Sequence, residues 1–113
     1  MRVRIRGQKT EITDRLRELA HRRIGFALGR YAGAIDEISL VLVEGGEAAG
    51  HERVRCLVSV SFARGQGMKV EQTGGDVSTA LDAALESAAR GVQRRLELRQ
   101  RGFLHDDGEE PPQ

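Results

Sequence analysis

The chain has 113 residues, a length that fits one domain and suffices to bury a core without disulfides or metal ions. Hydrophobic residues make up 39% and charged residues 31%, which excludes a disordered chain, and no apolar run approaches the roughly 20 residues of a membrane span. The net charge of +1 hides an asymmetry, because residues 1–105 hold all 18 Lys and Arg but 13 of the 17 Asp and Glu, a net charge of +5. This body is compatible with binding a polyanion but lacks a histone-like charge.

The first half of the chain predicts a strand, a helix and a second strand. Residues 2–7 (RVRIRG) alternate β-branched and basic side chains, as in a strand buried on one face. A helix is predicted over residues 14–30, because Thr13 is a favourable N-cap and apolar residues then recur at helical spacing. Residues 35–43 (IDEISLVLV) are apolar on both faces, which indicates a central strand.

The second half predicts a hairpin and a longer helix. Residues 53–63 and 68–73 alternate as strands, joined by a turn at RGQG and preceded by a glycine-rich turn over residues 44–52. A helix is predicted over residues 77–99, with Asp76 as its cap. Gly91 inside this helix either weakens it by about 1 kcal/mol relative to alanine or permits close packing.

The order β-α-β-β-β-α predicts an α+β fold: a two-layer sandwich in which two helices cover one face of a four-stranded mixed sheet. The first two strands should be parallel, because a helix joins them, and the remaining pairs should be antiparallel. We expect residues 1–101 to form a single domain and residues 102–113 to form an acidic, disordered tail.

Four features are most informative in combination: IRG at residues 5–7, EITDRLRELA at 11–20, the strand order of the middle, and DVSTALDAALESAARGVQRRL at 76–96. Over residues 2–101 they resemble the ribosome hibernation-promoting factors and ribosome-associated inhibitors, also called sigma-54 modulation proteins, of the short type. The resemblance implies a fold related to double-stranded-RNA-binding domains. It also implies a non-enzymatic factor that occupies the small-subunit RNA near the decoding centre and inhibits translation during dormancy or stress.

Basic residues on the two helices are the candidate contacts to ribosomal RNA. If the basic edge of the first helix faces the second helix, the arginines line one groove, and binding should weaken steeply with salt. The alternative is an ordinary solvated face, because Glu18–Arg22, Glu86–Arg90 and Glu97–Arg101 are favourable i,i+4 pairs worth about 0.2–0.5 kcal/mol each. The candidate phosphate contacts are Arg22, Arg23, Arg90, Arg94 and Arg95, with Lys9 in the first loop.

Some positions depart from the family pattern. Phe26, Gly29 and Ser87 stand where relatives tend to place Lys, and Ser78 stands where they usually carry an aromatic residue. These departures leave open an alternative function, a protein-interaction module of the same fold that has lost ribosome binding. Such a module would bind a protein partner, or a second copy of itself, through the outer sheet face or an edge strand.

The outer sheet face is a rival basic surface. RNA-binding sheets usually stack bases on exposed aromatic residues, and the outward strand positions here carry none. A solvated face or a partner surface is therefore favoured there. The basic residues concerned are Arg2, Arg4, Arg6, Arg53, Arg55 and Lys69.

No catalytic or metal-binding pattern is present in the sequence. His21, His51 and His105 lack a second metal ligand at a recognisable spacing. The single cysteine, Cys56, lies on the apolar face of a predicted strand and should be a buried small hydrophobe. We therefore expect no enzyme activity, metal or cofactor, no membrane partner and no small-molecule substrate, and a cytoplasmic location.

Overall fold

The computed structural model describes residues 1–46 and 53–102 and has the predicted order of elements. Residues 103–113 of the predicted tail and most of the turn predicted for residues 44–52 lie outside these ranges. In chain order, the elements are β1 (Arg2–Gln8), α1 (Asp14–Leu28), the 3₁₀-helix η1 (Gly29–Tyr31), β2 (Ile35–Gly46), β3 (Arg53–Phe62), β4 (Met68–Gly74) and α2 (Val77–Gln100).

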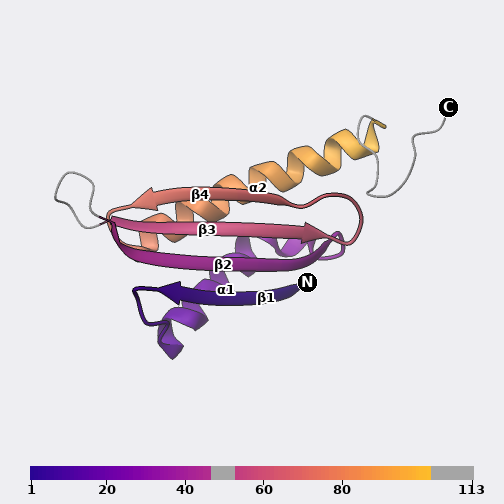
Figure 1. Cartoon of the computed structure of the whole chain (residues 1–113). Coiled ribbons are helices and arrows are strands. Elements are labelled where there is room, and N and C mark those ends of the chain that lie inside the picture. The colour runs from indigo at the N-terminus through magenta and orange to yellow at the C-terminus, as the bar shows by residue number, and fades with distance from the viewer. Residues whose placement is uncertain (47–52, 103–113) are drawn as a thin grey trace.

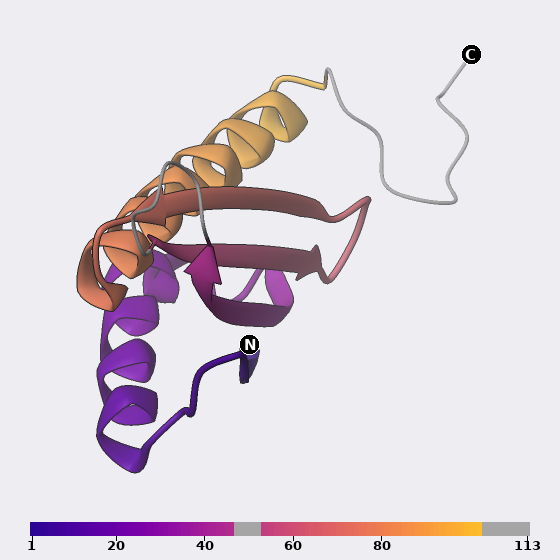
Figure 2. The same ribbon diagram turned by 60° about the vertical axis from the view of Figure 1, so that its left-hand side comes forward.

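The four strands form one sheet in the order β1-β2-β3-β4. β1 runs parallel to β2, with Val3 beside Ile38, whereas β2–β3 and β3–β4 are antiparallel pairs. Both helices lie on the same side of the sheet (Figure 1), and the turned view shows the two layers edge-on (Figure 2). The predicted two-layer sandwich with a mixed sheet is confirmed.

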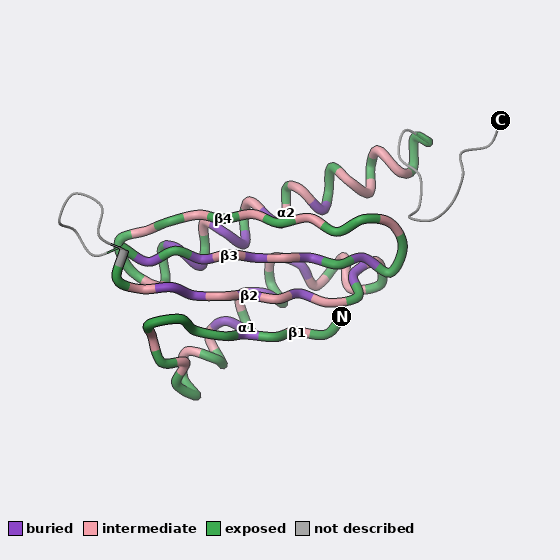
Figure 3. The backbone as a smooth tube through the Cα atoms, in the orientation of Figure 1, coloured by how far each residue is buried: buried purple, intermediate pink, exposed green. Residues whose placement is uncertain are grey.

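The core fills the space between the sheet and the helices. On β2 the inward residues Ile38, Leu40 and Leu42 are fully buried, as expected for a central strand. Buried segments concentrate on the two middle strands and on the sheet-facing sides of the helices (Figure 3). The side of the helical layer that faces away from the sheet is therefore free to carry charged residues.

Helix α1 begins where the sequence predicts it to begin and ends earlier. The Thr13 side chain accepts a hydrogen bond from the Leu16 backbone N–H, with 3.1 Å between Oγ1 and N. The predicted end at residue 30 is two residues late, because Gly29 opens the 3₁₀ turn η1. Such a tightened last turn is common at helix ends.

Asp76 caps the N-terminus of α2. Its carboxylate accepts a hydrogen bond of 2.8 Å from the Thr79 backbone N–H. This bond favours the charged form and lowers the pKa of Asp76 below its ordinary value of 3.8. The cap is therefore strongest when the carboxylate is ionised.

Replacing Asp76 with Asn should reduce the acid sensitivity of the fold. Because folding lowers the pKa of Asp76, its charge-dependent contribution is complete above the unfolded value near 3.8 and is lost as the pH falls through the folded value. Asn keeps a capping oxygen but does not titrate. Urea unfolding between pH 7 and pH 2 should show a shallower loss of stability for Asp76→Asn, and equal pH slopes would contradict the prediction.

Gly91 permits close packing of α2 on β4. A Cβ atom at this position would overlap the terminal methyl group of Met68. Gly91→Ala alone should change stability little, because displacement of Met68 offsets a gain in helix propensity of about 1 kcal/mol. In a Met68→Ala background the same change should stabilise by about 1 kcal/mol in urea unfolding. Equal effects in both backgrounds would show that the packing is irrelevant.

Candidate nucleic-acid interface

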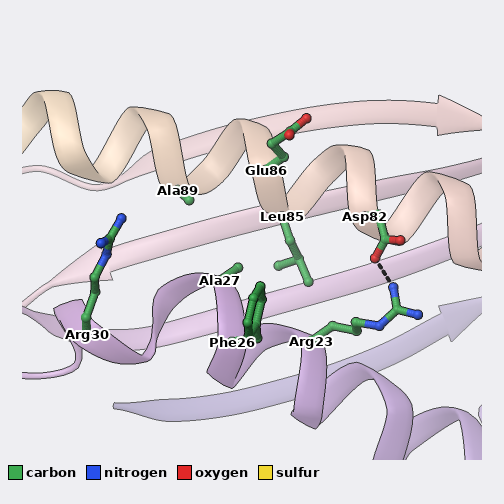
Figure 4. Close-up of a pocket in the computed structure, with 8 residues that line it drawn as sticks. All are labelled: Arg23, Phe26, Ala27, Arg30, Asp82, Leu85, Glu86 and Ala89. Carbon is green, nitrogen blue, oxygen red and sulfur yellow. Dashed lines mark hydrogen bonds and ion pairs between the residues drawn. The ribbon is translucent and has the colours of Figure 1, made fainter.

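A groove of about 730 Å³ runs between the two helices on the side away from the sheet, and we call it the interhelix groove. Its apolar lining comes from Ala27 of α1 and from Leu85 and Ala89 of α2. Figure 4 shows Phe26 and Arg30 pointing from the α1 side toward this space. The full lining is Arg23, Phe26, Ala27, Arg30, Asp82, Leu85, Glu86 and Ala89.

Arg23 crosses the interhelix groove to bind Asp82 in an ion pair (Figure 4). The side chain of Arg23 is 35% exposed and that of Asp82 is 54% exposed, so water still reaches both groups. The predicted phosphate contact Arg23 thus already has an anionic partner within the chain. A phosphate would have to share its guanidinium with the carboxylate or replace the carboxylate.

Arg22, Arg90 and Arg94 are the exposed members of the predicted set on the helices. Arg90 lies 3.5 Å from Glu86 in the predicted i,i+4 pair. Such exposed pairs are weak, so they cost little to break. Arg22 and Arg94 form no ion pair within residues 1–46 and 53–102. These three guanidinium groups can therefore meet an outside anion.

The predicted pairs of Arg22 with Glu18 and of Arg101 with Glu97 do not form among the residues that the structure describes. Glu97 instead accepts a long hydrogen bond of 3.4 Å from the Gln93 side chain. Of the three predicted i,i+4 ion pairs, only Glu86–Arg90 is present among the described residues.

Arg95 is held within the chain. Its guanidinium donates a hydrogen bond to the Gln66 backbone carbonyl and lies 5.2 Å from the centre of the Phe62 ring. One turn later, Arg99 donates to the Arg64 carbonyl with an N–O distance of 2.6 Å. These contacts fasten the last turns of α2 to the β3–β4 turn. The sequence predicted Arg95 as a phosphate contact, but it did not reveal this internal role.

Lys9 lies apart from the groove lining. It is exposed in the loop between β1 and α1, and its φ of 60° places it in the left-handed region. The structure therefore does not bring Lys9 together with Arg23 at the interhelix groove.

Several arginines on the outer sheet face form ion pairs with nearby carboxylates. Arg2 lies 3.1 Å from Asp36, Arg4 lies 3.5 Å from Glu37, and Arg55 lies 3.1 Å from Glu71 on the neighbouring strand. Cross-strand ion pairs of this kind stabilise a sheet. Arg2, Arg4 and Arg55 are consequently poorer candidates for phosphate contacts than Arg22 and Arg94.

The described part of the chain, residues 1–46 and 53–102, offers little for catalysis. Within it, no group of three or more His, Cys, Asp or Glu side chains could hold a metal ion, and no helix has the length and apolar character to cross a membrane. Cys56 is buried in the core, as predicted, and burial raises its pKa to about 12, which keeps the thiol protonated. The predictions for His51 and His105 lie outside the described residues.

Residues 3–100 match the family model described as Sigma 54 modulation protein / S30EA ribosomal protein. The solved N-terminal domain of Protein Y from Thermus thermophilus is 23% identical, with a TM-score of 0.68, over 84% of this chain and 99% of that domain. A ribosomal subunit interface protein from Coxiella burnetii is 14% identical, with a TM-score of 0.73, over 86% and 99% respectively. At these identities the two structures show a shared fold. A comparison with curated protein sequences gives no match.

Proposed function

The chain belongs to the sigma 54 modulation protein / S30EA ribosomal protein family, and from that membership we propose that it binds the small ribosomal subunit through its helical layer. Members of this family are non-enzymatic ribosome-binding factors. Binding would occupy ribosomal RNA near the decoding centre and inhibit translation during dormancy or stress. The protein would act in the cytoplasm, as one domain formed by residues 1–101.

The observation that carries this proposal is the exposure of Arg22, Arg90 and Arg94 on the helical layer. With 3.6 residues per turn, Arg90 and Arg94 lie on the side of α2 opposite the buried Val92. They therefore project away from the sheet, where a large RNA surface has unhindered access. The outer sheet face, in contrast, pairs Arg2, Arg4 and Arg55 with its own carboxylates.

The physical basis of binding would be phosphate contact combined with shape. Each arginine that neutralises a phosphate releases condensed counterions, so affinity falls as salt rises. Double-stranded RNA is recognised mainly by shape and by contacts to phosphates and 2′-hydroxyl groups, which needs no base-reading side chains on the helices. In this proposal Arg23, Arg95 and Lys9 are secondary contacts, because the first two have partners within the chain and Lys9 lies in a separate loop.

Co-sedimentation with purified small ribosomal subunits on sucrose gradients tests the proposal. The protein should travel with small subunits at low salt and be released progressively as salt rises. Large subunits at the same concentration provide the control and should retain little protein. Protein that stays at the top of the gradient at both low and moderate salt would overturn the proposal.

A second candidate function is a protein-interaction module that pairs through the sheet. The outer face carries the half-buried Val41 and Leu57 side by side on β2 and β3, and β1 and β4 are the edge strands of the sheet. Light scattering across a concentration series would detect pairing of copies. A stable dimer together with absent subunit binding would favour this function over the first.

A further inference from the structure

Phe26 is exposed in a way that the fold does not require. It is 94% exposed on α1, and it is not among the residues that pack against the core. The other exposed large hydrophobic residue in the described part of the chain is Met1, at 41%. An isolated exposed phenylalanine adds no packing energy to the fold, and its ring is accessible to a ligand.

Phe26 lies inside a cluster of arginines. Arg22 stands four residues before Phe26 on α1, so the two side chains lie on the same side of the helix. Arg30 and Phe26 both line the interhelix groove. Positive charge thus flanks the ring along the axis of α1.

The carboxylates of the interhelix groove do not cancel this charge. Asp82 is bound by Arg23, and Glu86 lies 3.5 Å from Arg90. Each carboxylate thus has an arginine within reach. Arg22 and Arg30 add further positive charge beside Phe26, and the Arg30 guanidinium also lies 5.1 Å from the centre of the Tyr31 ring. The surface combines one flat apolar ring with cations at both ends.

We propose that Phe26 is a stacking platform for an unpaired RNA base, with Arg22 and Arg30 contacting the phosphates on either side of that nucleotide. The inference rests on the proposed function and names the part of the RNA that this chain would recognise. Proteins that bind single-stranded nucleic acid combine aromatic rings for the bases with positive charge along the backbone. The base must be unpaired, because the faces of a base inside a duplex are covered by its neighbours.

A protein partner fits this surface less well. Protein interfaces have a contiguous apolar core, whereas Phe26 and Met1 are the only exposed large hydrophobic residues in the part of the chain that the structure describes. Beside the ring, the apolar part of the groove lining is limited to Ala27, Leu85 and Ala89. Its volume of about 730 Å³ falls within the range of about 300–1,000 Å³ that is usual for small-ligand pockets, which suits a single nucleotide.

Tryptophan fluorescence tests stacking directly, because the natural chain contains no Trp. Phe26→Trp places one reporter at the proposed platform, and Thr73→Trp places a matched reporter at an exposed position on β4. A short single-stranded oligoadenylate should quench the first reporter and leave the second unchanged. An RNA duplex of equal length should quench Phe26→Trp much less. Unchanged emission of Phe26→Trp with oligoadenylate and with small subunits would overturn the inference.

Binding to small subunits gives the second readout. Phe26→Leu keeps an apolar side chain but removes the ring, and it should weaken binding about tenfold or more, the loss expected for one base stack. Phe26→Tyr keeps the ring and should bind like the unaltered protein. Equal binding of the Leu and Tyr variants would overturn the inference while the proposed function stood. Quenching by oligoadenylate without any subunit binding would support stacking and overturn the proposed function.

Discussion

Reversing Arg90 and Arg94 to Glu together should remove the protein from the small-subunit fraction, with an affinity loss of at least about 100-fold. The double change deletes two phosphate contacts and places two negative charges against the RNA backbone. A like-charge contact at an interface costs several kcal/mol, and about 2.7 kcal/mol already corresponds to 100-fold. Both residues are exposed, so the fold itself should tolerate the change.

The salt dependence of binding should change together with the affinity. The slope of log affinity against log salt is about −0.9 for each phosphate neutralised on a duplex. Loss of two contacts should therefore flatten the slope by roughly 2. A variant that weakens binding at every salt concentration with an unchanged slope would show that Arg90 and Arg94 do not contact phosphates.

A matched control separates a local surface from total charge. Arg6 and Lys69 are exposed on the outer sheet face and form no ion pair with the described residues. Arg6→Glu combined with Lys69→Glu changes the net charge by the same amount as the helix variant. It should leave sedimentation with small subunits nearly intact. Equal losses in the two double variants would assign binding to overall charge and contradict the helical surface.

The sequence was sufficient for the elements whose signals are local. Alternation assigned the inward faces of the strands, and hydrogen-bonding side chains at Thr13 and Asp76 marked both helix starts. The ends were harder to predict. β2 extends to Gly46, past the predicted end at residue 43, because its last residues still pair with Val54 and Arg53 across a bulge. Glycines give no strand signal, so only the pairing reveals this extension.

The sequence predicted which helix arginines of the candidate site are exposed, but it did not predict which residues they contact. Helical periodicity indicated that Arg90 and Arg94 point away from the core. Arg23 and Asp82, in contrast, are separated by 59 residues and meet only because of how the two helices pack. Arg95 likewise meets a carbonyl of the β3–β4 turn, whose conformation no periodicity describes.

Phe26 illustrates a signal that was present but was interpreted only as a difference from relatives. With 3.6 residues per turn it lies far around the helix from the buried Ile24, which predicts exposure. What the sequence could not supply is the groove beside the ring, since Leu85 and Ala89 come from the other helix. Phe26 becomes part of a candidate binding site only through the packing of α1 against α2, which forms the groove beside its ring.

Truncating Leu81 to Ala should destabilise the protein by about 2–5 kcal/mol, the usual cost of removing a buried leucine side chain. Leu81 is fully buried and belongs to the core formed by the sheet and both helices. Small domains have total stabilities of about 5–15 kcal/mol, so this single change removes a large part of the margin. Urea unfolding at 25 °C gives the free energy directly if the transition is two-state.

Leu98 provides the matched control for Leu81, because it lies on the same helix and undergoes the same chemical change to Ala. It is only half-buried and does not belong to the core or pack against it, so its truncation should cost less than about 1 kcal/mol. Similar losses at the two positions would mean that α2 is not anchored through its inward face.

At temperatures where Leu81→Ala remains folded, this variant should still bind small subunits, because it leaves the exposed arginines unchanged. If folded Leu81→Ala lost as much affinity for small subunits as the Arg90→Glu/Arg94→Glu variant, recognition would depend on how α2 packs on the core and not on its exposed arginines.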